Sequence, residues 1–215
     1  MKKEQFTKKI HNFGDGNVSY IEWNDESELP GFQFSHATGF NSLTYRKLLE
    51  PLSNEFHIRA IDARGHGFTE TEAIPKKMYD WVVYRDDLIR SVENFVKEKG
   101  EPIILGGHSM GGATVMQVAA SRPELVSGLV LIEPVLIPKF NLNLIKLGRK
   151  FPTFKFLPLI KEATSRADST LKRRREFPNK EMIKRSYKGR GAFTTWVDGF
   201  LDDYIAVSYT HLTLP

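Results

Sequence analysis

The stretch that most constrains the fold is Pro102 to Met116, "PIILGGHSMGGATVM", in which an apolar run passes through clustered glycines into a helical pattern. Four residues that are apolar on both faces are typical of a central strand in a parallel sheet. The helix that follows, expected at 109–122, has to return the chain along one face of that sheet, because parallel strands need a crossover. A strand, a sharp turn and a helix in this order predict an α/β architecture.

Strand and helix patterns alternate over most of the first 134 residues, which predicts a mostly parallel sheet with helices on both faces. Apolar runs predict strands at 18–23, 31–37, 56–62, 102–105 and 125–134. Helical spacing of apolar residues predicts helices at 42–53, 78–99 and 109–122. We expect the first two strands to form a hairpin. The strand at 125–134 has the pattern of a buried strand, and we expect the truncated chain to leave it as a long apolar edge.

The pattern changes after Pro134 and divides the chain into three predicted parts. Residues 1–137 form the α/β core, and residues 138–206 form a helical cap whose short helices are separated by prolines. A back-translation of the last nine residues, "VSYTHLTLP", resembles the transposase end and adapter used in sequencing libraries. We therefore expect residues 207–215 to be a non-native tail and exclude them from the fold.

The composition is that of an ordinary globular chain and excludes several kinds of site. There are no cysteines among the 215 residues, so disulfides and thiolate metal sites are excluded. The basic N-terminus lacks the apolar segment of a signal peptide, and no apolar stretch approaches the length of a membrane span. We expect a cytoplasmic protein.

The charge is distributed unevenly along the chain. Residues 139–190 hold 16 Lys or Arg against four Asp or Glu, a net +12 against +5 for the whole chain, so the remainder carries −7. Such a basic segment is a solvated helical face or a weak attractor of anionic surfaces. Its run "LKRRR", 171–175, lacks interleaved aromatic residues, so we expect no nucleic-acid partner.

The residues Gly107-His108-Ser109-Met110-Gly111 form a G-x-S-x-G motif between the predicted strand and helix. This context predicts a strained turn that presents Ser109 as a nucleophile, with glycines where side chains would clash. The helix start points its amides, that of Met110 included, at the place where an oxyanion would form. A phosphate-binding loop is the competing interpretation, but no Lys-Ser or Lys-Thr follows the glycines.

Three motifs in order resemble those of the α/β-hydrolase family, and the likeness covers about residues 13–138. The motif around Ser109 is the first. The second is "HATGFNS", which starts at His36 and resembles the family's oxyanion loop, with Gly39 in it. Ala37 and Thr38 stand where a single Gly is usual, so the resemblance leaves the second oxyanion amide open between Thr38 and Phe40.

The third motif is "DARGHG", Asp62 to Gly67, which resembles the family's turn after the fourth strand. The resemblance implies that its Asp and Arg are structural, and that His36 and His108 support the loop and the serine turn. It also implies a cap that sets specificity; Phe140, Phe151, Phe154 and Phe156, with three leucines nearby, either line an apolar pocket there or form the cap's own core.

A serine nucleophile needs a general base, usually a histidine steadied by a carboxylate. Triad order in the family is serine, acid, histidine, and His211 alone follows Ser109, within the tail that we exclude. We therefore expect the base, and two further strands, beyond this chain, with Glu133 as the candidate acid. The alternatives for Glu133 are a strand-end carboxylate or a cap contact, and Asp198, Asp202 and Asp203 are weaker candidates.

The predicted function of the intact protein is hydrolysis of a carboxylic ester or related acyl compound, of EC 3.1.1 type, through an acyl-serine intermediate. No metal or organic cofactor is expected, and the expected partner is a small apolar acyl substrate. Carbon–carbon bond hydrolysis and acyl transfer at the same site stay open, as does a non-catalytic binding protein on the same fold. The 215-residue chain by itself is expected to be a truncated, poorly soluble and hydrolytically silent fragment.

Overall fold

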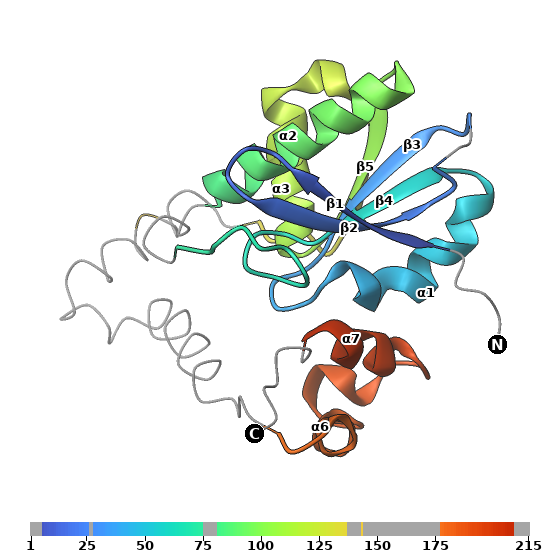
Figure 1. The fold of residues 1–215 in the computed structure, drawn as a ribbon, viewed down its shortest axis with the longest axis vertical. Coiled ribbons are helices and arrows are strands. Elements are labelled where there is room, and N and C mark those ends of the chain that lie inside the picture. The colour runs from blue at the N-terminus through green and yellow to red at the C-terminus, as the bar shows by residue number, and fades with distance from the viewer. Residues whose placement is uncertain (1–5, 26–27, 75–80, 137–142, 144–176, 209–215) are drawn as a thin grey trace. The chain divides into compact units, whose positions relative to one another are not determined.

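The structure, a computed structural model, describes residues 6–25, 28–74, 81–136, 143 and 177–208 (Figure 1). One compact unit comprises Met1–Val135 together with Asn179–Pro215, and a second comprises Leu136–Pro178. Most of the second unit lies outside the described residues. The segment after Asn179, expected as part of the cap, belongs to the same compact unit as the sheet.

Six strands form a single sheet in the order β1-β2-β4-β3-β5-β6. Figure 1 labels the first five, β1 to β5. Their bounds are β1 Thr7–Asn12, β2 Asn17–Trp23, β3 Gly31–Ser35, β4 His57–Ile61, β5 Ile103–His108 and β6 Val126–Ile132. β1 and β2 are antiparallel, as are β2 and β4, whereas the four strands from β4 to β6 run parallel. The predicted mostly parallel α/β sheet is therefore confirmed.

The predicted hairpin between 18–23 and 31–37 is wrong. β2 pairs with β1 on one side and with β4 on the other, and β3 lies between β4 and β5. The hairpin is instead β1–β2, closed by a turn in which Gly14 and Gly16 have positive φ. β1 escapes prediction because it is a mostly exposed edge strand, "TKKIHN", with no apolar alternation.

Helices follow strands as the sequence pattern predicts, with shorter bounds and additional 3₁₀ turns. The α-helices are α1 Arg46–Leu49, α2 Val82–Lys99, α3 Met110–Ser121, α6 Lys180–Tyr187 and α7 Phe200–Ser208. The 3₁₀ turns are η1 Ser42–Tyr45, η2 Glu50–Asn54, η4 Pro123–Leu125 and η6 Gly191–Thr194. Among the described residues no helix combines the length and the apolar character needed to span a membrane.

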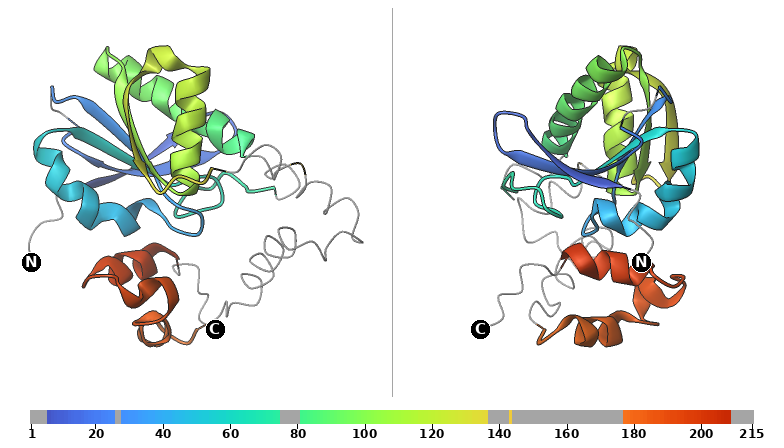
Figure 2. Two further views of the ribbon diagram at one scale, coloured as in Figure 1. Left: turned by 180° about the vertical axis from the view of Figure 1, so that it is seen from behind. Right: turned by 45° about the vertical axis from the view of Figure 1, so that its right-hand side comes forward.

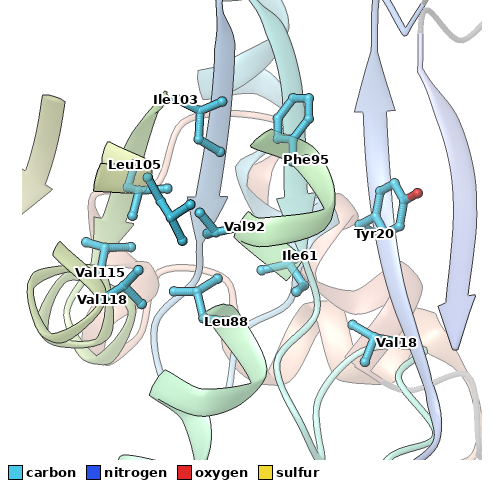
Figure 3. Packing of buried hydrophobic residues seen from close by; sticks show 11 residues of the cluster. Val18, Tyr20, Ile61, Leu88, Val92, Phe95, Ile103, Leu105, Val115 and Val118 are labelled. Atoms are coloured by element: carbon cyan, nitrogen blue, oxygen red, sulfur yellow. The ribbon is translucent and has the colours of Figure 1, made fainter. Parts of the chain in front are cut away.

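One face of the sheet is covered by α2 and α3, as Figures 2 and 3 show. Leu88, Val92 and Phe95 of α2 recur at helical spacing and pack against Ile103 and Leu105 of β5. Val115 and Val118 of α3 belong to the same cluster, and all seven of these side chains are almost fully buried. Burying several such side chains at about 1.5–3 kcal/mol each anchors both helices on the sheet.

The opposite face is covered by the η1–α1–η2 segment. Tyr45 and Leu49 pack there against Phe34 of β3 and Ile58 of β4. Trp23, at the end of β2, is 1% exposed and belongs to the same cluster. With helices on both faces, β3, β4 and β5 become the interior strands of the sheet, which explains their buried runs.

The strand predicted at 125–134 forms as β6, and it is the apolar edge strand that the sequence predicts for this chain. β6 lies at the edge of the sheet, and Leu129, Val130 and Leu131 are each about two-fifths exposed or more. Its continuous apolar run is the pattern of a strand covered on both faces. Within the described part of the chain nothing pairs with its outer edge.

Candidate active site

Ser109 lies at the corner between β5 and α3. β5 ends at His108 and α3 begins at Met110, and the Ser109 backbone has φ 54° and ψ −112°, a left-handed conformation that a serine adopts only at some cost. Its amide donates to the Ile132 carbonyl at 3.0 Å, and its carbonyl accepts from the Val135 amide at 3.1 Å. These two bonds hold the strained backbone, and the side chain stays partly accessible.

The glycines around Ser109 are required by close backbone approach. A Cβ on Gly107 would lie 2.5 Å from the Gly111 carbonyl carbon, and a Cβ on Gly111 would lie 2.1 Å from the Ser35 carbonyl oxygen. A Cβ on Gly112 would lie 2.9 Å from that of Pro134. The start of α3 is therefore pressed against the ends of neighbouring strands, as the motif predicts.

His108 points away from the serine hydroxyl and toward the loop after β3. Its Nδ1 lies 2.7 Å from the Tyr45 hydroxyl, which in turn accepts the Ala37 amide at 3.0 Å. Burial lowers the pKa of His108, while the charge of Glu133 opposes this. The neutral ring therefore accepts from Tyr45, and the loop is tied to the residue that precedes Ser109.

The loop after β3 uses most of its amides internally. Phe40 donates its amide to the Ala37 carbonyl at 3.1 Å, which closes a turn with Gly39 at φ 77°, and the Gly39 amide donates to His66 Nε2 at 3.1 Å. The Thr38 amide has no hydrogen-bond partner among the described residues. Its side-chain hydroxyl contacts the Met110 sulfur at 3.2 Å, which places Thr38 beside the start of α3.

Two histidines link this loop to the turn after β4. His36 Nε2 accepts the Ala63 amide at 2.9 Å, and its Nδ1 lies 2.7 Å from the Ala37 carbonyl. Burial, together with nearby His66, lowers the pKa of His36 to about 3. Burial also lowers the pKa of His66, against the effect of its hydrogen bond to the Arg64 carbonyl. Both rings are therefore neutral at neutral pH.

Asp62 is fully buried and fastens the same two segments together. Its carboxylate accepts the Ser42 amide at 2.7 Å and the Phe68 amide at 3.0 Å, and a Cβ on Gly67 would lie 2.2 Å from it. Burial raises the pKa of Asp62 despite these hydrogen bonds. Arg64 forms an ion pair with Asp87 at 2.7 Å. Neither residue reaches Ser109 through a hydrogen bond, in agreement with a structural role.

The structure brings no histidine to the Ser109 hydroxyl within the described residues. His36, His66 and His108 are engaged as above, and His211 lies outside the described residues. Glu133 directly follows β6, is exposed, and has φ 42°, an uncommon value for a glutamate. Its charge acts on His108.

The acidic residues of the last described helix have other partners. Asp203 receives two hydrogen bonds from the Arg46 guanidinium, at 3.0 and 3.1 Å, and Asp202 pairs with Lys184 at 2.7 Å. The Asp198 carbonyl accepts from Lys47. These contacts fix α7 against η1 and α1, and they do not connect the three aspartates to Ser109.

Aromatic side chains gather around Phe40 of the loop. Its ring lies 5.4 Å from that of Trp196 and 5.5 Å from that of Tyr204, both with edge-to-face geometry. Phe193 packs on Trp196 at 4.8 Å. The predicted pocket residues, Phe140 to Phe156 and the leucines between them, lie outside the described residues.

One group of side chains has the spacing of a metal site in the described part of the chain, but its charges are already matched. Glu22, His57 and Glu98 have ligand atoms within 4.8 Å of one another. Arg59 donates to Glu22 and to Glu98 at 2.5 Å each, and Lys9 lies 2.6 Å from Glu22. This is a buried ion-pair cluster under α2, and we assign no metal to it.

A serine held at such a corner, on a mostly parallel sheet that begins with an antiparallel hairpin, defines the α/β-hydrolase class. Residues 33–190 match the family model described as serine aminopeptidase, S33, and the chain belongs to this family.

Individual relatives agree with this assignment. Human monoglyceride lipase is 36% identical over 105 residues, which are 48% of this chain and 34% of the relative. The 2-(acetamidomethylene)succinate hydrolase of Mesorhizobium japonicum is 32% identical over 104 residues, 48% of this chain and 35% of the relative. The matched segments thus span about a third of the length of these curated relatives.

A solved structure extends the likeness of the fold. The crystal structure of E-2-(acetamidomethylene)succinate hydrolase superposes with a TM-score of 0.66 at 20% identity, over 94% of this chain and 64% of that chain. At this identity the comparison bears on the fold, which it supports over nearly the whole chain.

Sequence reasoning missed two residues that build the site. Tyr45 was not singled out within the helix predicted at 42–53, and His66 was assigned only to the turn after the fourth strand. Both bind amides of the loop that starts at His36. The signal available was a polar atom on a residue expected to be buried, which has to find a partner.

Proposed function

We propose that the whole protein carrying this chain is a serine hydrolase of carboxylic esters or related acyl compounds, with Ser109 as the nucleophile. The observation that carries the proposal is the backbone of Ser109, which has positive φ at the first turn of a helix and is enclosed by obligatory glycines. Such strain is kept at sites where function needs it. The family membership supports hydrolysis, and the names of relatives such as monoglyceride lipase support an ester.

In the proposed reaction the Ser109 hydroxyl attacks the carbonyl carbon of the substrate and gives its proton to a general base. The carbonyl oxygen becomes an oxyanion, which the amides of Met110 and Thr38 stabilise. Collapse of this intermediate expels the alcohol, which takes the proton from the base, and leaves an acyl group on Ser109. Water then releases the acid by the same steps. The base is a residue outside those described here.

The hydrogen bonds of the loop support Thr38, and not Phe40, as the second oxyanion donor. The Phe40 amide already donates to Ala37, and the Gly39 amide already donates to His66. Thr38 keeps its amide available and contacts Met110 through its side chain. Two amides from neighbouring segments, each with no competing acceptor among the described residues, are what oxyanion stabilisation requires.

Glu133 is our candidate for the triad acid. It directly follows β6, the strand adjacent to β5, and the loop after it bonds to the Ser109 backbone through Val135. A carboxylate there would steady the imidazolium that forms as the base takes a proton. A strand-end carboxylate with no catalytic part is the alternative, and Glu133→Gln separates the two.

The proposed substrate is a small apolar acyl compound, and the reaction needs no metal or organic cofactor. The aromatic rings around Phe40 support an apolar wall beside the loop. The basic segment 139–190 adds at most a weak attraction to anionic surfaces, and most of it lies outside the described residues.

The test is turnover by the full-length protein of matched substrates: a nitrophenyl ester, a monoacylglycerol and the corresponding amide. Ester cleavage that disappears in Ser109→Ala supports the proposal. Transfer of the acyl group to an added alcohol in preference to water would favour an acyltransferase. Binding of the acyl compounds without turnover or a covalent adduct would favour a binding protein on the same fold.

A further inference from the structure

His66, in the turn after β4, makes a hydrogen bond that has no part in the reaction proposed above. His66 Nε2 lies 3.1 Å from the amide nitrogen of Gly39, in the loop that also carries Thr38. An amide can only donate, so Nε2 must be the unprotonated nitrogen of the ring. Nδ1, 2.9 Å from the Arg64 carbonyl, carries the proton. Both ring nitrogens are thus engaged, and the tautomer is defined by its partners.

We infer that His66 is a positioning residue for the proposed oxyanion site, acting through Gly39 on the peptide that carries the Thr38 amide. The inference rests on the proposed function. Gly39 has φ 77° and lies within the turn that the Phe40 amide closes on Ala37. His66 fixes the Gly39 amide, which follows Thr38, and Tyr45 fixes the Ala37 amide, which precedes it. Because both neighbouring amides are held, the Thr38 amide has a single orientation.

The surroundings of the His66–Gly39 bond indicate that it positions the loop more than it stabilises the fold. Gly39 is exposed, so water can reach its amide and replace the histidine when the bond is lost. A catalytic donor, in contrast, loses efficiency when it moves by a fraction of an ångström. The His66–Gly39 bond is thus expected to affect the reaction more than the folding of the chain.

The groups that face His66 come from three elements. The His36 ring lies 5.0 Å away, the Tyr84 ring of α2 lies 6.3 Å away, and the carboxylate of Asp62 acts on His66 electrostatically. Neutral His36 and Tyr84 leave Asp62 as the charge that favours protonation, and burial opposes it. Once protonated, Nε2 would donate and could no longer accept from Gly39.

The first experiment measures the bond itself by NMR on the ¹⁵N-labelled full-length protein. The variants are His66→Phe, which removes the acceptor, His66→Gln, which places a carbonyl oxygen near Nε2, and His11→Phe as a control in β1. We expect the Gly39 amide to exchange about tenfold faster in His66→Phe, with most of the protection restored in His66→Gln. An unchanged Gly39 amide, or an Nε2–H tautomer in the wild-type ring, would overturn the inference.

The second experiment measures the rate of Ser109 labelling by a fluorophosphonate in the full-length protein. We expect His66→Phe to react about 10- to 100-fold more slowly at neutral pH, and His66→Gln to recover most of the rate. The ratio of the wild-type rate to the His66→Gln rate should fall as the pH is lowered, because glutamine has no proton to gain. A labelling rate that His66→Phe leaves unchanged contradicts the inference and leaves the proposed function intact.

A wild-type protein that does not label at Ser109 contradicts the proposed function itself. In that case the NMR experiment alone decides whether His66 positions Gly39.

Discussion

The hydroxyl of Tyr45 lies between the Ala37 amide and His108 Nδ1, at 3.0 and 2.7 Å. It therefore joins the loop after β3 to the residue immediately before Ser109, from a helical segment that covers the opposite face of the sheet. A single buried phenol thus aligns the two segments from which the proposed oxyanion donors come.

Removing this hydroxyl with Tyr45→Phe should destabilise the chain by about 1–3 kcal/mol, because the buried Ala37 amide loses its acceptor. The free energy of unfolding in urea measures the loss. Tyr20→Phe is the matched control, since Tyr20 is similarly buried and its hydroxyl makes no hydrogen bond within the described residues. Equal losses in the two variants would show that the Tyr45 bridge contributes nothing of its own.

Gly111→Ala should be among the most damaging single substitutions in the core. The new Cβ would lie 2.1 Å from the Ser35 carbonyl oxygen, and backbone cannot move aside as a flexible side chain can. We expect a loss of about 3 kcal/mol or more, measured by thermal or urea unfolding. Gly128→Ala is the control, because its Cβ would lie 3.7 Å from the nearest atom of Ile104. A tolerated Gly111→Ala would contradict the packing described for the start of α3.

The buried cluster under α2 predicts a loss of stability at acid pH. Burial alone would raise the pKa of Glu22, but hydrogen bonds from His57, Lys9 and Arg59 outweigh it and lower the pKa from 4.5 to about 2. A carboxylate with a depressed pKa stabilises the fold fully above its unfolded value, and this contribution is lost as the pH falls from about 4.5 to about 2. The loss amounts to about 3 kcal/mol.

Urea unfolding between pH 7 and pH 2 checks this prediction. Glu22→Gln should be less stable than the wild type at neutral pH, and the difference should shrink as the pH falls. Glu55→Gln, at an exposed glutamate with no ion pair in the described part of the chain, should keep the wild-type slope. If the free energy of unfolding of Glu22→Gln fell with pH as steeply as that of the wild type, Glu22 would not be the source of the acid sensitivity.

The site could be predicted from sequence where backbone sterics determine residue type. Neighbouring backbone atoms leave no room for a side chain at Gly107 or Gly111. A motif of fixed spacing reflects such steric requirements. The place of Ser109 at a strand-to-helix corner was predictable for the same reason. Strand order was harder, because an apolar run records burial and not the identity of the neighbouring strand. For this reason the sequence pattern paired 18–23 with 31–37, although β2 pairs with β1 and β4.

Hydrogen-bond partners that are distant in sequence could not be predicted at all. The choice between Thr38 and Phe40 depends on which amides already have acceptors, and the acceptors include His66, 27 residues from Gly39. Local pattern therefore predicted the strand-to-helix corner at which Ser109 lies, and tertiary contacts were needed for the groups around it.

The most direct test of the central claim is covalent labelling of the full-length protein with a fluorophosphonate, followed by peptide mass spectrometry. The claim predicts one adduct per chain, on Ser109, and no adduct in Ser109→Ala or after heat denaturation. An unlabelled folded protein, or an adduct that persists in Ser109→Ala, would contradict it.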